Sequence, residues 1–163
     1  MQFPASAAEV KQAQVPHNLF VTGLFLIDLS LTPAVIVLNL GMLGLLIPLF
    51  CSAALLAYIF LRSKKNTSWF VAAHWKLSWS HGRLLLLGYA ISAGLILLAW
   101  LISLSAHEAS MAHIMWKAMT RIAVVPTLIF VMITAVLEAS AIGLASKGEV
   151  PDKIVSGFPP PAD

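Results

Sequence analysis

Apolar residues run almost without interruption through the first third of the chain. From Asn18 to Leu61 the sequence is mainly Leu, Ile, Val, Ala, Phe and Gly, and Asp28 is its only formal charge. About 20 apolar residues cross a bilayer core of roughly 30 Å, whereas this run would extend about 66 Å as one helix at about 1.5 Å per residue. The pattern therefore predicts two membrane-spanning helices, over residues 18–38 and 42–61.

The best turn signals between these two helices are Asn39, Gly41 and Gly44. A rival turn at residues 28–33 would place Asp28 in a loop. It would leave only about ten apolar residues before the turn, too few to cross a bilayer. The turn near Asn39 is therefore the better prediction, and it puts Asp28 near the middle of the first span.

The second half of the chain repeats this hairpin pattern. Residues 84–106 carry no charge, and residues 119–145 are interrupted only by Arg121 and Glu138. Each stretch is long enough to cross a membrane as a helix. The sequence thus predicts an all-α integral membrane protein, a bundle of four transmembrane helices arranged as two hairpins.

The segment between the two hairpins, residues 66–82, has a different character. Asn66 and Thr67 offer a helix N-cap, and Trp69, Trp75 and Trp79 follow with lysine nearby. Tryptophan and lysine are typical of the headgroup level of a membrane, so we expect a short helix on the cytoplasmic surface. The tryptophans would either set the depth of this helix in the lipid or form a docking surface for a partner subunit.

Composition agrees with a membrane protein. The chain is 60% hydrophobic and 10% charged, with a mean hydropathy of +0.90, whereas soluble domains carry about 25% charged residues. We expect one membrane domain over residues 1–163. A basic pI of about 9.3 does not indicate nucleic-acid binding, because the basic residues flank apolar spans and form no stripe with aromatics. The polar segment 1–16 has no apolar core typical of a signal peptide, so we expect the first span to direct insertion.

Lysine and arginine predict the orientation, since they accumulate on the cytoplasmic side. Only Lys117 and Arg121 fall on one side of the four-span arrangement. The other side holds all the remaining basic residues: Lys11, Arg62, Lys64, Lys65, Lys76, Arg83, Lys147 and Lys153. Both termini, including the proline-rich tail 146–163, are then expected in the cytoplasm of a bacterium, with the spans in its inner membrane.

Asp28 is the first candidate for chemistry, because a carboxyl group within a span is costly and often functional. Thr32 lies four residues later on the same helical face. Pro33 has no backbone N–H and is expected to kink the helix, and a kink with polar neighbours can host a proton or a cation. The alternative is a protonated carboxyl group that hydrogen-bonds a neighbouring helix and holds the bundle together.

Glu138 and two histidines complete the candidate sites. Glu138 lies near the inner end of the last span, where it would serve an ion, a proton or a buried polar contact. His17 and His81 begin the first and third spans at similar depth, and two histidines on facing helices are the axial ligands of a b-type haem. They lie at the ends of spans rather than inside them, so interfacial hydrogen bonding is the alternative. No metal site is expected.

No catalytic motif accompanies these residues, and the sequence favours a protein without catalytic activity or a cofactor of its own. The leading hypothesis is an accessory or structural subunit of a larger inner-membrane complex, such as an energy-converting or electron-transport complex. Its partners would be the lipid bilayer and other membrane subunits. Two alternatives stay open: a small proton or cation transporter or channel that uses Asp28, and a haem-binding membrane redox subunit.

Overall fold

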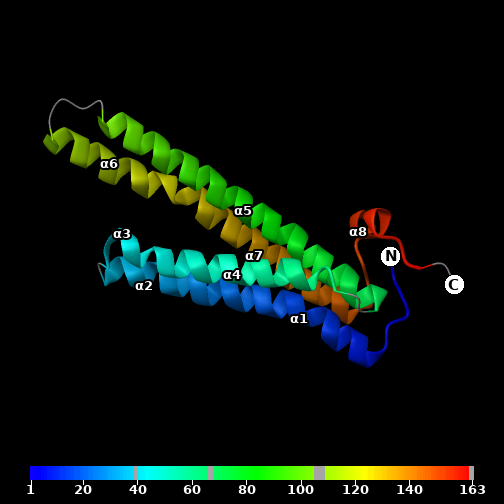
Figure 1. Ribbon diagram of the computed structural model, residues 1–163. Coiled ribbons are helices and arrows are strands. Elements are labelled where there is room, and N and C mark those ends of the chain that lie inside the picture. The colour runs from blue at the N-terminus through cyan, green and yellow to red at the C-terminus, as the bar shows by residue number, and fades with distance from the viewer. Residues whose placement is uncertain (39, 66–67, 105–108, 162–163) are drawn as a thin grey trace. The chain divides into compact units, whose positions relative to one another are not determined.

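The computed structural model describes residues 1–38, 40–65, 68–104 and 109–161. These residues form helices, with no strand beyond one isolated β-bridge (Figure 1). The elements in chain order are α1 (Ala7–Gly23), the π-helix η1 (Leu24–Leu31), α2 (Thr32–Val37), α3 (Gly41–Gly44), α4 (Leu46–Arg62), α5 (Trp69–Leu104), α6 (Ala109–Ala123), α7 (Val125–Ser146) and α8 (Asp152–Gly157).

Three stretches of helix in the described residues are long and apolar enough to cross a membrane. They are Ala7–Val37, Trp69–Leu104 and His113–Ser146, and Leu46–Arg62 is a shorter apolar helix. Large apolar side chains along them are exposed, such as Val37 at 83% and Ile122 at 67%, which suits a lipid environment rather than water. The all-helical prediction is confirmed, and the helices are consistent with a membrane protein.

The chain divides into two compact units, described separately below. Unit 1 contains Met1–Gly82 and Ala135–Asp163, and unit 2 contains Arg83–Thr134. The long helices α5 and α7 each contribute residues to both units. All the groups of the candidate site described below belong to unit 1.

The first long helix begins earlier than the apolar pattern predicts. Ser6 caps α1, with its hydroxyl accepting from the Glu9 N–H while the Glu9 carboxylate accepts from the Ser6 N–H. This capping box stabilises a helix start, so most of the polar segment 1–16 is helical rather than separate from the span. The helix then continues through η1 and α2 to Val37. The predicted turn residue Asn39 lies outside the described residues.

Asp28 lies in η1, and the π-helix coincides with the predicted proline kink. The N–H of Thr32 donates to the carbonyl of Ile27, five residues earlier, and the Thr32 hydroxyl donates to the same oxygen at 3.0 Å. This wider register falls directly before Pro33, which has no N–H to continue an α-helix. The sequence located the irregularity, and the structure shows that it is a change of register over eight residues.

The structure joins two elements that the sequence predicts as separate. Residues 69–82 of the expected surface helix and residues 84–104 of the expected span are parts of α5, a single helix of 36 residues. No proline interrupts this stretch, and its glycine at the junction, Gly82, faces α4. A Cβ atom at position 82 would lie 3.0 Å from the Leu56 side chain, so the small residue permits close packing and does not end the helix.

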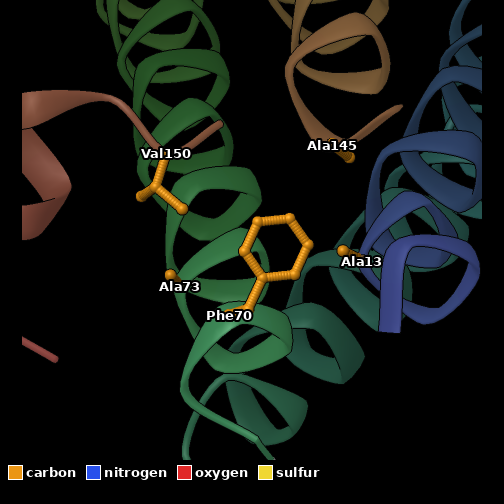
Figure 2. Close-up of a cluster of buried hydrophobic side chains, with 5 residues drawn as sticks. All are labelled: Ala13, Phe70, Ala73, Ala145 and Val150. Atoms are coloured by element: carbon orange, nitrogen blue, oxygen red, sulfur yellow. The ribbon is translucent and has the colours of Figure 1, made fainter. Parts of the chain in front are cut away.

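The core of unit 1 is built from small side chains around one aromatic ring. Ala13 of α1, Ala73 of α5 and Ala145 of α7 are buried against Phe70, together with Val150 of the C-terminal segment (Figure 2). Alanine at each contact lets the helices approach closely. This packing holds α1, α5 and α7 together beside the candidate site.

The C-terminal tail packs on its own chain. The described residues of the proline-rich tail 146–163 include α8 and cover part of α5. The Trp69 indole N–H donates to the Phe158 carbonyl at 3.1 Å, and Lys76 Nζ lies 3.2 Å from the centre of the Phe158 ring. Burial of apolar area and a cation–π contact thus hold the tail in place.

Unit 2 shows how one glycine sets the distance between two helices. A Cβ atom at Gly88 of α5 would lie 2.6 Å from the Cβ of Phe130 on α7, whereas one at Gly94 meets nothing within 4 Å. Four residues after Gly88, the Ser92 hydroxyl oxygen accepts from the N–H and hydroxyl of Thr127, at 3.2 and 2.7 Å. The Thr127 N–H is available because it lies in the first turn of α7, where N–H groups have no acceptor within the helix.

Candidate functional site

Four ionisable side chains meet inside unit 1. His17 comes from α1, His74 and His81 from α5, and Glu138 from α7. His17, His74 and Glu138 are 0% exposed, and the His81 side chain is 13% exposed. We call these four residues the His–Glu cluster. Charged groups are rarely buried so fully unless they are paired, so the cluster is the strongest candidate site among the described residues.

Helix geometry explains how residues distant in sequence reach one place. His74 and His81 are seven residues apart, which is two turns of α5, so both lie on one face. The alanine contacts around Phe70 bring α1 and α7 against that face. His17 lies one turn after Ala13 on α1, and Glu138 lies two turns before Ala145 on α7. Their side chains enter the same interior.

Hydrogen bonds connect all four side chains. Glu138 Oε2 lies 2.5 Å from His17 Nδ1, and its other oxygen, Oε1, lies 2.9 Å from His81 Nδ1. His17 Nε2 lies 2.9 Å from His74 Nδ1. The side chains therefore form one chain in the order His74, His17, Glu138, His81, with the carboxyl group bridging two histidines from different helices.

The protonation states follow from donor and acceptor counting. An ionised carboxylate only accepts hydrogen bonds, and a neutral imidazole has one donor and one acceptor nitrogen. With Glu138 ionised, His17 and His81 both donate from Nδ1. His17 Nε2 then accepts from His74 Nδ1–H, which leaves a lone pair on His74 Nε2.

One added proton can reverse the direction of these bonds without breaking any. A proton arriving at His74 Nε2 allows His74 to give its Nδ1 proton to His17 Nε2, and His17 to give its Nδ1 proton to Glu138. Glu138 is then a neutral acid that donates to His17, and His17 donates to His74. Both arrangements use every bond between the four groups, so the cluster can pass a proton from His74 through His17 to Glu138.

The His74 end of this row of hydrogen-bonded side chains has a polar atom without a partner. His74 Nε2 has no hydrogen-bond partner although it is buried, and neither has Ser78 Oγ, one turn further along α5. A buried polar atom without a partner costs about 1–3 kcal/mol, and such atoms often mark functional positions. The backbone of Glu149 is the group from the tail that interacts with the His74 ring.

Asp28 lies away from the His–Glu cluster. Asp28 is half-buried in η1 and lies eleven residues after His17, about 16 Å along the helix at about 1.5 Å per residue. The Thr32 hydroxyl donates to the Ile27 carbonyl. Of the three residues predicted for an ion, a proton or a buried contact, Glu138 is the one placed in the His–Glu cluster.

The two predicted haem ligands lie close together, but they are bonded to a common carboxyl group. His17 and His81 share the carboxyl group of Glu138 through their Nδ1 atoms. An axial ligand needs a free ring nitrogen, and both ring nitrogens of His17 are hydrogen-bonded. The cluster as it stands therefore does not fit a haem between these two histidines. Among the described residues, no group of three or more His, Cys, Asp or Glu side chains has the geometry to hold a metal ion.

The three tryptophans predicted at an interface contact neighbouring parts of their own chain. Trp75 is 3% exposed, with its ring against Tyr58 and beneath Arg62 of α4. Trp79 packs against Phe60, with ring centres 4.8 Å apart, and Trp69 bonds to Phe158 in the tail. Trp69 and Trp79 keep part of their surface exposed, whereas the chain itself covers Trp75.

Sequence reasoning found three of the four members of the cluster but did not combine them. It placed Glu138, His17 and His81 near the ends of spans and gave His74 no role. The missed signal was the common depth of all four residues on three different helices. A buried carboxyl group needs donors at its own depth, and His17 and His81 supply them.

Comparisons with known proteins find no matching family model, no similar curated protein and no similar solved structure. The fold itself defines the class: the described residues form an all-helical protein with three helices that could cross a membrane. The cluster within it is the observation from which a function can be argued.

Proposed function

We propose that the protein crosses the membrane four times, with α4 as the additional crossing and both termini in the cytoplasm. α4 has 17 residues, about 25 Å at roughly 1.5 Å per residue, and α3 precedes it. The distribution of lysine and arginine supports this orientation in a bacterial inner membrane.

This topology predicts opposite reactivity for two engineered cysteines. In a Cys51→Ser background, a cysteine replacing Lys65 should react with a membrane-impermeant maleimide only after the cytoplasmic side is opened. A cysteine replacing Lys117 should react in intact cells. Reaction of both from the same side would contradict four crossings in this orientation.

We further propose that the protein binds protons at the His–Glu cluster and passes them along it. The observation that carries this proposal is a buried carboxyl group bridging His17 and His81, with His17 bonded onward to His74. Ionisable groups inside membrane helices commonly serve proton relays. Proton transfer between groups at 2.5–2.9 Å requires no movement of helices, so the cluster is arranged for repeated loading and unloading.

This function predicts that Glu138 changes its protonation state within the pH range in which the protein stays folded. Infrared difference spectra of the purified protein between acidic and alkaline pH should show a protonated carboxyl band that is absent in Glu138→Gln and present in Asp28→Asn. NMR spectra of protein labelled with ¹⁵N-histidine should show the His17 proton on Nδ1 at one end of this pH range and on Nε2 at the other. A spectrum without a Glu138-dependent band would refute proton binding at the cluster.

The accessory subunit of a larger membrane complex is the second proposal. The burial of the cluster supports this proposal. A carboxyl group that bonds α7 to α1 and α5 can serve as a structural contact alone, without any proton transfer. Exposed apolar side chains on α4 and α6, such as Phe50 and Ile114, suit lipid tails or partner helices. A cluster that keeps one protonation state in the same spectra would support this role.

A further inference from the structure

The C-terminal tail lies over the unsatisfied end of the His–Glu cluster. Val150 is 1% exposed and packs with Phe70 and Ala73, the residues beside His74 on α5 (Figure 2). The Glu149 N–H is already bonded to the Leu144 carbonyl at 2.9 Å. The group that Glu149 can offer to His74 is therefore its carbonyl oxygen, which accepts a hydrogen bond from a protonated ring nitrogen.

Three sets of contacts fix this part of the tail, which we call the strap (residues 147–158). At its start, the Phe3 N–H donates to the Gly148 carbonyl at 2.8 Å, and Gly148 adopts φ +69°. At its end, Phe158 accepts from the Trp69 indole and lies under Lys76. Between these anchors Met1 binds the strap. Its carbonyl accepts from the Val150 N–H and its ammonium group donates to the Val150 carbonyl, both at 2.9 Å, and the same ammonium group pairs with Asp152 at 3.2 Å. None of these is a bond within a helix, so the strap can open without unfolding the helices.

We propose that His74 is the point at which protons enter and leave the His–Glu cluster, and that the strap controls this exchange. The inference rests on the proposed proton binding and adds its route and regulation. In the closed state the Glu149 carbonyl can receive the N–H that forms when His74 Nε2 takes a proton. Opening of the strap exposes the same nitrogen to water, which supplies or accepts the proton.

The surrounding groups leave His74 as the exchange point. The titratable groups facing it are His17 on α1 and, through His17, Glu138 on α7. On its own helix, Lys76 is directed to the Phe158 ring, while His81 binds the far oxygen of Glu138. The strap contributes the Glu149 backbone. His74 is thus the terminal member of the hydrogen-bonded chain on the side that the strap covers.

The test compares the rate and the extent of proton exchange at the cluster. Phe158→Ala and Trp69→Phe remove strap contacts, and neither residue belongs to the cluster. Ser156→Ala, at an exposed position on α8, is the matched control. Imidazole N–H exchange with water, measured by NMR on ¹⁵N-histidine protein in detergent, should be about two-fold to ten-fold faster at His74 and His17 in both variants. It should be unchanged in Ser156→Ala, and the protonation states at equilibrium should match the wild type in all three.

The possible outcomes separate the two proposals. If the wild-type cluster shows no change of protonation with pH, the proposed function fails. If it does change, but both strap variants exchange at the wild-type rate, control by the strap is refuted while proton binding stands. In His74→Leu, exchange at His17 should be slowed and should no longer respond to Phe158→Ala. Continued acceleration by Phe158→Ala in that background would refute His74 as the exchange point.

Discussion

Replacement of Glu138 by alanine is expected to cause the largest loss of stability of any single substitution in the cluster. The change leaves the Nδ1–H groups of His17 and His81 buried without an acceptor. Each unsatisfied donor costs about 1–3 kcal/mol, and removing one member of a buried ionic contact costs about 3–5 kcal/mol. Thermal unfolding in a mild detergent, followed by circular dichroism, should shift to clearly lower temperature.

Two further variants test the reason for this loss. Glu138→Gln keeps the size of the side chain and one acceptor oxygen, and a change of tautomer at either histidine can satisfy its amide N–H. Its stability should therefore lie between the wild type and Glu138→Ala. Ser140→Ala changes an exposed position on the same helix and should have no measurable effect. Equal stability of Glu138→Ala and Ser140→Ala would show that the bonds to Glu138 do not hold the helices together.

Replacement of the whole cluster by apolar residues is expected to separate stability from function. Combining His17→Leu, His74→Leu, His81→Leu and Glu138→Met removes every polar partner at once and leaves side chains of comparable size. Apolar replacement of a buried ionic group is often neutral or stabilising, with about 1–3 kcal/mol lost where packing is imperfect. The variant should unfold at a higher temperature than Glu138→Ala.

The same variant should take up fewer protons after a downward pH step, measured with a soluble indicator dye in detergent. Asp28→Asn is the matched control, because it removes the other carboxyl group within the predicted spans but leaves the cluster intact. Wild-type uptake by the apolar variant, together with a loss in Asp28→Asn, would move the proton site to η1. Normal uptake in both variants would argue for the structural role alone.

The sequence was sufficient to predict helices long and apolar enough to cross a membrane, because long apolar runs have one favourable environment. It also predicted where the first helix is irregular, since Pro33 cannot continue the α-helical register. It could not predict that residues 69–104 form one helix. The tryptophan-rich stretch resembles a surface helix in composition, whereas in the structure Trp75 is buried against Tyr58 of α4 and Gly82 leaves room for the Leu56 side chain.

The sequence alone determined which residues were chemically unusual: one carboxyl group in each of two apolar spans, and histidines near their ends. The tertiary structure decided which of them act together. Asp28 drew attention because its own span is so apolar, yet the bonded groups come from α1, α5 and α7, packed through Ala13, Ala73 and Ala145. Hydropathy reports the depth of a residue along its own helix, whereas a hydrogen-bonded cluster depends on which helix faces meet, and that depends on side-chain packing between helices.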